Sequence, residues 1–377
     1  DLGRIEEEMR RIVAADFKIE RIVVSRDEAI KLFMEEGEDY KVELLEEMEE
    51  EEVTLYRQGE FIDLCRGPHL PSTGYVRFFK LLNVASSHWR GEEGNPIMQR
   101  VYGISFPEEE MLRDYLRRLE EVRRRDHRIL GPRLDFFSMP AEQIGPGLVL
   151  WHPRGALVRY LIEEFLRRIH LRAGYKLVYT PHIAWSSLWE RSGHLEYYKE
   201  NMYLLEKGGS EYVVKPMNCP LHILIYKSRR RSYRELPIRY FELGTVYRFE
   251  RSGTLHGLMR ARGFTQDDAH IFCTEEQLRG EVVGVLKLME RILSAFGFTE
   301  FKVELSTWDP SRPWEYMGSE EVWSEAQSAL EEALQEVGYS YEVMEGEAAF
   351  YGPKIDVKLV DSMGREWQCS TIQLDFN

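Results

Sequence analysis

The sequence has no long apolar run and only four cysteines among its 377 residues. A membrane-spanning helix needs roughly 18 to 20 consecutive apolar residues, and no segment approaches that length. The first residues mix acidic and basic side chains in a helical pattern, which differs from the apolar core of a signal peptide. The cysteines lie far apart, so they indicate a reducing compartment and argue against a disulfide framework. We therefore expect a soluble, globular, cytoplasmic protein with no membrane partner.

Acidic residues outnumber basic ones, 65 to 50, so the formal net charge is −15. Contacts to phosphate need lysine and arginine, so this balance argues against nucleic-acid binding unless the charges are segregated. Basic residues do cluster at 117–133 and at 226–234, whereas acidic residues concentrate at 46–52. A solvated helix face is the simpler interpretation of the first basic cluster. The second is the better candidate for contact with nucleic acid.

Glycine-rich phosphate loops are absent as well. The sequence contains neither G-x-x-x-x-G-K-[ST] nor G-x-G-x-x-G, which disfavours a P-loop or a Rossmann site. Helices are expected at residues 156–174, 275–296 and 319–337. Strands are expected at 175–181, 212–217, 239–246, 270–273, 301–306, 339–345, 354–360 and 366–376. This order predicts an α+β fold, with a mainly antiparallel sheet and helices against one face.

The first 106 residues alternate helical and strand-like pieces, with helices expected to about Phe17 and over 27–36. Strand-bearing segments are expected at 53–65 and 78–91. From Pro107 to about Leu130, apolar residues recur at helical spacing and predict one amphipathic helix that ends near Gly131 and Pro132. We therefore expect domains at residues 1–106 and 134–377, joined by a connecting helix at 107–133.

Residues 248–273 concentrate charged and metal-capable side chains between two apolar runs. The flanks have the pattern of strands, so we expect a hairpin whose loop carries the charged middle. Arg248, Glu250, Arg260 and Arg262 suit a nucleoside triphosphate, because phosphates need fixed cations and adenine needs an acceptor. The alternative for any one of these arginines is a surface ion pair.

This segment resembles motif 2 of class II aminoacyl-tRNA synthetases, and its end, FTQDDAHIF, resembles the threonyl-tRNA synthetase family. Further segments agree with that family in the same order: DLCRGPH at 63–69, KPMNCP at 215–220, AFYGPKID at 349–356 and WQCSTIQLDF at 367–376. The resemblance implies a class II antiparallel sheet flanked by helices, preceded by part of an α+β editing domain. Residues 156–181 resemble motif 1, which implies a homodimer.

The resemblance also implies the roles of the ATP-binding residues. Arg248 would hold the α-phosphate and Arg260 the distal phosphates. Glu250 would accept a hydrogen bond from the adenine amino group, and Phe264 would stack on the ring. Such chemistry rests on positioning and electrostatics, normally with Mg²⁺ on the phosphates, and needs no side-chain nucleophile.

By the same resemblance, Cys219 and His270 match two zinc ligands. Zn²⁺ accepts thiolate sulfur and imidazole nitrogen, and direct ligation of a hydroxyl would reject valine, which a hydrophobic pocket rejects poorly. Asp268 would fix the threonine hydroxyl. The other matched positions around this pocket are Gln266, Tyr351, Lys354, Gln368 and Gln373. Cys273 and Cys369, which have no such match, are expected to be buried packing residues.

The segment from Asp63 to His69 implies an editing site that removes serine, which also has a hydroxyl and an amine. Cys65, His69, Asp63 and Lys41 match family editing positions. Without the resemblance, a nucleophile–base pair or a buried structural Cys–His pair would be open alternatives. The H-x-x-x-H half of the family's editing site is absent from the sequence, so we expect incomplete editing.

These matches predict a threonine–tRNA ligase that joins L-threonine to tRNA(Thr) with ATP. We expect the chain to be truncated at both ends, without motif 3, the third zinc ligand and the anticodon-binding domain, which leaves its own activity open. The alternatives are a prolyl- or seryl-tRNA synthetase, disfavoured by Cys219 with His270, and a synthetase-like regulator that binds threonine or tRNA without catalysis.

Overall fold

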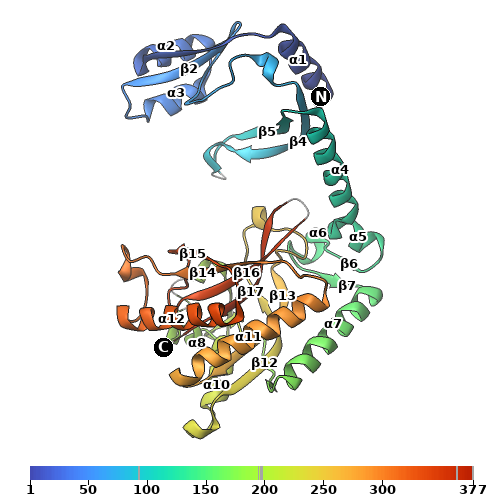
Figure 1. Ribbon diagram of the computed structural model, residues 1–377, viewed down its shortest axis with the longest axis vertical. Coiled ribbons are helices and arrows are strands. Elements are labelled where there is room, and N and C mark those ends of the chain that lie inside the picture. The colour runs from blue at the N-terminus through green and yellow to red at the C-terminus, as the bar shows by residue number, and fades with distance from the viewer. Residues whose placement is uncertain (92–93, 194, 196–197, 362–363, 376–377) are drawn as a thin grey trace. The chain divides into compact units, whose positions relative to one another are not determined.

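The computed structural model describes residues 1–91, 94–193, 195, 198–361 and 364–375, coloured along the chain in Figure 1. The chain divides into two units, Asp1–Glu120 and Glu121–Asn377. Phe376, the last residue of the strand expected at 366–376, lies outside the described residues. In the described part of the chain, no helix is long and apolar enough to cross a membrane.

The first unit holds a three-stranded antiparallel sheet, in the order β1-β2-β3, and a separate antiparallel pair, β4 and β5. Its helices are α1 (Leu2–Ala15), α2 (Arg26–Glu36) and α3 (Asp39–Glu46). Its strands are β1 (Ile19–Ser25), β2 (Glu52–Gln58), β3 (Phe61–Leu64), β4 (Phe78–His88) and β5 (Ile97–Phe106). Buried side chains of α2 and α3, such as Phe33 and Leu45, pack against Leu55 of β2 and form the core. The helices and strand segments expected here are confirmed.

The helix expected from residue 107 to 130 is two helices, α4 (Glu109–Arg125) and α5 (His127–Arg133). The prediction of a single connecting helix is therefore wrong. Asp126 lies between them with an extended backbone, and its carboxylate accepts a hydrogen bond of 2.8 Å from the backbone N–H of Arg128. An aspartate in this position stabilises a new helix start, which apolar periodicity does not reveal.

The second unit is built around a four-stranded sheet, β15-β14-β16-β17, and a three-stranded sheet, β13-β12-β8. Its longer strands are β10 (Tyr203–Lys207), β11 (Ser210–Val214), β12 (Ile238–Tyr247), β13 (Gly263–Phe272), β14 (Lys302–Thr307), β16 (Lys354–Val360) and β17 (Glu366–Gln373). Shorter strands are β6 (Phe137–Ser138), β7 (Leu150–Trp151), β8 (Lys176–Leu177), β9 (Ile183–Trp185) and β15 (Glu342–Glu345). The pairs β12–β13, β14–β16 and β16–β17 are antiparallel, whereas β8 and β15 join their neighbours in parallel. The mainly antiparallel α+β fold is confirmed.

Besides α5, the described helices of this unit are α6 (Ala141–Ile144), α7 (Pro153–Arg172), α8 (Ser187–Arg191), α10 (Cys219–Lys227), α11 (Glu275–Ala295) and α12 (Glu320–Val337). Helices α11 and α12 lie side by side against one face of the four-stranded sheet (Figure 1). Leu286 of α11 and Leu330 of α12 meet Leu305 of β14 and Ile355 of β16, and all four side chains are fully buried. The long helices α7, α11 and α12 match their expected positions.

Two local expectations are wrong. The strand expected at 175–181 stops after Leu177, since the backbone N–H of Thr180 donates to the carboxylate of Glu242 instead of a strand partner. Cys369 is exposed, not buried, and Cys273 is only partly buried. Cys369 lies at a bulge, because Val357 pairs with Ser370 and Lys358 with Gln368, so it has no partner in β16.

The hairpin expected at 248–273 also has different limits. Strands β12 and β13 pair without interruption from Ile238 with Phe272 to Tyr247 with Gly263. The loop is therefore residues 248–262, and the charged residues that follow Gly263 lie on β13 and not in the loop. Because side chains alternate along a strand, four predicted site residues share one face of β13. These are Phe264, Gln266, Asp268 and His270.

Candidate functional site

Helix α10 is joined to the β12–β13 hairpin by a buried amide. Asn218, which precedes Cys219 at the helix start, is fully buried and donates from Nδ2 to Oδ2 of Asp268 over 2.8 Å. A Cβ on Gly244 of β12 would lie 2.3 Å from Asn218 Nδ2, so this position requires glycine. The Asn218 Oδ1 atom is buried without a hydrogen-bond partner. An unused acceptor therefore remains on the residue that precedes Cys219.

A chain of buried polar side chains runs beneath this point. Lys215 donates to the hydroxyl of Thr180 over 2.8 Å, and that hydroxyl donates to Oε2 of Glu242 over 2.8 Å. His222 Nε2 lies 3.0 Å from the same Oε2 atom, and His222 Nδ1 lies 2.8 Å from Nδ1 of His270. Lys215 and His222 are fully buried, and Glu242 is 3% exposed. Such a network is stable only when every member has a partner.

The partners of Glu242 favour its ionised form. Burial raises its pKa, but hydrogen bonds from His222 and Thr180 and the charge of Lys215 outweigh burial and lower the pKa to about 2. Burial also lowers the pKa of Lys215, which Glu242 partly offsets. Glu242 is therefore a carboxylate at neutral pH and accepts every hydrogen bond that it makes.

The two predicted metal-binding residues lie in the same neighbourhood. Burial, and then the charge of Asp268, raise the pKa of the Cys219 thiol. Burial lowers the pKa of His270, which favours the neutral imidazole that binds metals. Asp375 interacts electrostatically with both residues. Within the described ranges, no group of three or more histidine, cysteine, aspartate or glutamate side chains is arranged to hold a metal ion.

The predicted ATP residues lie on the hairpin loop, with Arg248 and Glu250 at its start and Arg260 near its end, and on the adjoining β13, which carries Phe264. The Arg248 guanidinium lies 5.3 Å from the centre of the Phe264 ring, and its Nε donates to the carbonyl of Pro216 over 3.1 Å. Arg260 and Glu250 form an ion pair of 2.9 Å. The structure thus places the Arg248 cation beside an aromatic ring and the Arg260 cation beside a carboxylate.

Arg262, which the sequence places among the arginines that suit a nucleoside triphosphate, is buried and supports the loop instead. Its guanidinium donates to the backbone carbonyl of Glu250 over 2.7 and 2.9 Å and lies 4.2 Å from the centre of the Phe249 ring. It is 7% exposed, so its charge is directed inward and fixes the loop. Arg262 is one of several arginines in the charged loop. Only its burial distinguishes it from the arginines that face solvent.

Strands β16 and β17 add a second polar group. Gln368 donates to Oδ1 of Asp356 over 2.6 Å, Lys354 pairs with the same carboxylate, and Ser306 donates to it over 3.0 Å. Asp356 is 3% exposed. It was not among the predicted site residues, although it ends the AFYGPKID segment. Asp356 therefore fixes two predicted residues, Lys354 and Gln368.

Tyr351 connects this strand pair to the neighbourhood of Cys219. Its hydroxyl donates to Oε1 of Gln373 over 2.9 Å. Burial, and then the nearby Cys219, raise the pKa of the Tyr351 hydroxyl, so it remains a donor. A cavity of about 130 Å³ opens beside it, lined by Met317, Gly318, Val322, Trp323, Ala326, Tyr351, Gly352 and Pro353. The structure thus brings together Cys219, Asp268, His270, Tyr351 and Gln373.

The predicted editing residues form two pairs in the first unit. Lys41 Nζ lies 3.0 Å from Asp63 Oδ1, and His69 Nε2 lies 3.0 Å from the sulfur of Cys65. Burial lowers the pKa of Lys41, but Asp63 and Glu38 outweigh burial and raise it. Tyr56 stacks on the His69 ring with 4.0 Å between the ring centres. These pairs are partly open to water.

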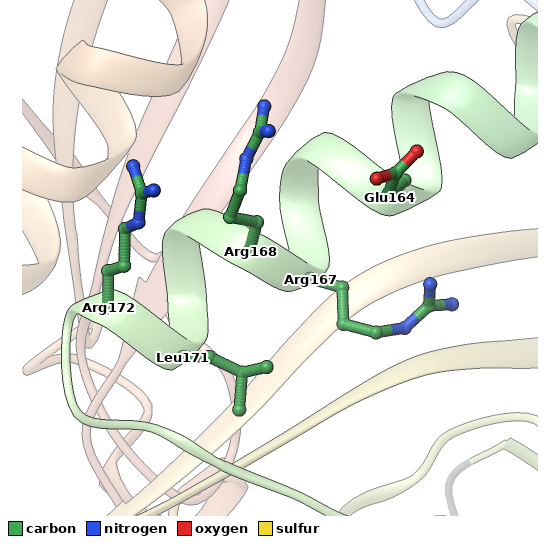
Figure 2. A pocket seen from close by; sticks show the side chains of 5 residues that line it. All are labelled: Glu164, Arg167, Arg168, Leu171 and Arg172. Atoms are coloured by element: carbon green, nitrogen blue, oxygen red, sulfur yellow. The ribbon is translucent and has the colours of Figure 1, made fainter.

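A larger hollow, of about 370 Å³, lies along α7. Figure 2 shows the five side chains that line it, all from that helix: Glu164, Arg167, Arg168, Leu171 and Arg172. None belongs to the predicted site. Three of its five lining side chains are arginines, so the hollow is mainly basic.

Two family models match parts of the chain. Residues 200–377 match the class II core domain of the tRNA synthetases for G, H, P, S and T. Residues 53–102 match the second additional domain of threonyl and alanyl tRNA synthetases. The two matches fall on the segments that carry the grouped site residues and the Cys65–His69 pair.

Curated relatives are similar along the whole chain. A threonine–tRNA ligase of Nitrosococcus oceani is 54% identical over 379 residues, and one of Thermotoga neapolitana is 55% identical over 376 residues. Each match covers all of this chain and 58% of the relative. The chain therefore spans less than two thirds of the length of these relatives.

Two solved structures are similar in fold. The RNA binding domain of threonyl-tRNA synthetase from Cryptosporidium parvum has a TM-score of 0.63 and 43% identity, covering 67% of this chain and 62% of that chain. A putative threonyl-tRNA synthetase from Aeropyrum pernix has a TM-score of 0.63 and 41% identity, covering 67% and 60%. Both agree with the α+β fold described above.

Proposed function

Because the chain belongs to the threonyl-tRNA synthetase family of class II aminoacyl-tRNA synthetases, we propose that the protein is a cytoplasmic enzyme that activates L-threonine with ATP and transfers it to tRNA(Thr). The observation that carries the proposal is the shared face of β13. It presents Phe264, near Arg248, together with Asp268 and His270, near Cys219. One strand face would thus bind the nucleotide at one end and the amino acid at the other.

In the first step, the threonine carboxylate attacks the α-phosphorus of ATP, and the bond to pyrophosphate breaks. Arg248 would stabilise the charge that builds on the α-phosphate, and Phe264 would stack on adenine. Glu250 and Arg260, which pair with each other here, would exchange that contact for the adenine amino group and the distal phosphates. Mg²⁺ would accompany ATP. In the second step, a terminal ribose hydroxyl of tRNA attacks the threonyl carbonyl, and AMP leaves.

The residues around Cys219 fit a zinc ion, since they offer a thiol, an imidazole and an unused buried acceptor. We propose that Cys219 and His270 hold it. When bound, zinc would supply direct ligation of the threonine amino group and hydroxyl, a contact that valine cannot complete. Asp268 would accept a hydrogen bond from that hydroxyl. Gln266, Tyr351, Lys354, Gln368 and Gln373 would orient the rest of the substrate.

We propose that the first unit contributes to the removal of serine from tRNA(Thr). Its Lys41–Asp63 and Cys65–His69 pairs lie near one another in sequence and are open to water, as a hydrolytic site requires. Cys65 would position His69 and a water molecule, without attacking the substrate itself. The match of residues 53–102 to the second additional domain supports this role.

We also propose a homodimer that forms through α7. Along this helix Leu157, Tyr160 and Leu161 are 59%, 56% and 54% exposed, although they are large and apolar. Burial of such a face in a second subunit would stabilise the assembly. Sedimentation of the full-length protein tests it. A wild-type monomer would contradict this proposal, and Leu161→Glu should convert a dimer to a monomer.

The main test is ATP–pyrophosphate exchange by the full-length protein with threonine, serine, proline and valine as substrates. We expect exchange to be fastest with threonine. Arg248→Ala should lower the rate by about 100- to 1000-fold, since it removes one fixed charge from the developing transition state. Lys41→Ala in the first unit is the control and should leave exchange unchanged. Exchange with proline but not threonine, or binding of threonine without exchange, would contradict the proposal.

A further inference from the structure

Arg260 lies in a compact turn within the hairpin loop. The backbone N–H of His256 donates to the carbonyl of Arg260 over 3.0 Å, and the N–H of Met259 donates to the carbonyl of His256 over 3.0 Å. Gly257 has a φ of 53°, a backbone conformation that glycine adopts without strain. These bonds fix the backbone of residues 256–260. A contact that holds this turn therefore also holds the backbone of Arg260.

One backbone donor of the turn binds a side chain of another element. The N–H of Leu258 donates over 2.9 Å to Nε2 of His127, the first residue of α5. Because a peptide N–H can only donate, Nε2 is the acceptor of this bond. Burial, opposed by the charge of Asp126, lowers the pKa of His127, so the ring is neutral at pH 7. A Cβ on Gly257 would lie 2.3 Å from the same Nε2 atom, so the ring and the turn are in close contact.

Two further contacts support the turn through His256. Arg128, the next residue of α5, places Nη1 3.4 Å from Nδ1 of His256, while its Nη2 donates to Asp126 over 2.6 Å. The His256 ring lies 5.2 Å, centre to centre, from the ring of Trp367 on β17. The indole N–H of Trp367 donates to Asp361 over 3.1 Å, which fixes that ring in turn. The turn is thus in contact with both α5 and β17.

We propose that His127 is a positioning residue for ATP, because its hydrogen bond to the turn at residues 256–260 holds Arg260 where the distal phosphates bind. The inference rests on the proposed function for the role of Arg260. It adds a residue of α5, which would act through the loop without touching ATP. Without this bond, the turn would have to be ordered each time that ATP binds, and the cost would weaken binding.

The first experiment tests the contact in the absence of ATP. His127→Leu has a side chain of similar volume but no acceptor, whereas in His127→Gln the amide oxygen can replace Nε2. In the full-length protein, hydrogen–deuterium exchange of the Leu258 amide should be about tenfold faster in His127→Leu, the equivalent of one lost hydrogen bond. His127→Gln should exchange at nearly the wild-type rate. Equal rates in wild type and His127→Leu would overturn the proposal.

The second experiment measures ATP–pyrophosphate exchange by the same variants of the full-length protein. We expect the KM for ATP to rise about tenfold in His127→Leu, with kcat and the KM for threonine unchanged, because only ATP contacts Arg260. His127→Gln should restore the KM for ATP. A merely structural role would lower kcat by reducing the folded fraction and leave the KM for ATP unchanged, and that result would overturn the proposal.

Ile129→Ala is the matched control, because Ile129 lies on the same helix and its side chain is 53% exposed. It should leave the KM for ATP unchanged, and a rise equal to that of His127→Leu would overturn the proposal. Thermal unfolding shows whether each variant is folded. A wild-type protein that shows no exchange with threonine would contradict the proposed function. ATP affinity measured by calorimetry then decides this inference: weaker binding by His127→Leu supports it, and equal binding overturns it.

Discussion

Each of the two units has a glutamate that is only 3% exposed and lies among cations, but Glu6 and Glu242 are enclosed in different ways. Glu6 belongs to the first unit and Glu242 to the second. Glu6 pairs with Lys80 and Arg10, whose side chains are 44% and 59% exposed. Glu242 pairs with Lys215 and His222, whose side chains are 1% and 0% exposed. In the first unit only the glutamate is buried, whereas in the second unit the glutamate and both of its partners are buried.

The difference separates a structural contact from a prepared site. Glu6 accepts from the backbone N–H of Leu81 over 2.9 Å and so fastens α1 to β4, while its cations remain in water. Glu242 and both partners lose their water, which costs more free energy than a simple tie between elements requires. This cost is understandable where the network orients side chains at a site. The candidate editing pairs, by contrast, need no buried support because they are open to water.

The largest expected effect that tests this comparison is on stability. Glu242→Ala leaves Lys215 buried without its counter-charge and should lower the free energy of unfolding by about 3–5 kcal/mol. Glu6→Ala frees two cations that water can reach, and it should cost about 1–3 kcal/mol. Urea unfolding, followed by a probe in each unit, measures both values. A cost for Glu6→Ala equal to or above that for Glu242→Ala would remove the distinction.

Acid should weaken the second unit in a defined pH range. The pKa of Glu242 is lowered from 4.5 to about 2, so its stabilisation is complete above pH 4.5 and is lost as pH falls toward 2. The loss should be about 3 kcal/mol. Glu242→Gln removes this titration, so the stability difference between wild type and variant should shrink over the same range. Unfolding curves from pH 6 to pH 2.5 test this, and a constant difference would contradict it.

The smallest effect is expected in the first unit. Cys65→Ala removes the 3.0 Å contact that orients His69, but the Tyr56 ring still stacks on His69. Loss of one hydrogen bond of about 1.4 kcal/mol corresponds to about tenfold. Hydrolysis of Ser-tRNA(Thr) by the full-length protein should therefore slow about tenfold, with threonine activation unchanged. Cys369→Ala, which removes an exposed thiol of the second unit, is the control. Equal loss in both variants would deny Cys65 a specific role.

Periodic patterns predicted much of the fold. Helices α7, α11 and α12 carry apolar residues at helical spacing, and each appears where it was expected. The pattern failed at Asp126, where a side-chain cap starts a new helix within a polar stretch, and at Thr180, where a distant carboxylate takes the backbone N–H. Both predictions failed because a single hydrogen bond determines the local structure there, and the spacing of apolar residues carries no information about that bond.

Short motifs predicted the grouping of the site residues. Their spacing of two residues puts four of them on one face of the strand that this segment forms: Phe264, Gln266, Asp268 and His270. Asp356 was missed, and Arg262 was expected to face a phosphate rather than support the loop, because neither residue type nor spacing reveals burial. The limits of the hairpin were misjudged because charged residues were taken to mark the loop, although ten uninterrupted pairs extend the strands.

The sequence by itself determined the family and the set of side chains available to the site, because both depend on residue types in a fixed order. Only the tertiary structure decided how those side chains are supported. Thr180, Lys215, His222, Glu242 and His270 come from separate elements and meet only after the hairpin packs against α10. A buried polar atom takes its partners from whatever packs against it. The contacts that connect Glu242, His222 and His270 are for that reason a property of the folded protein alone.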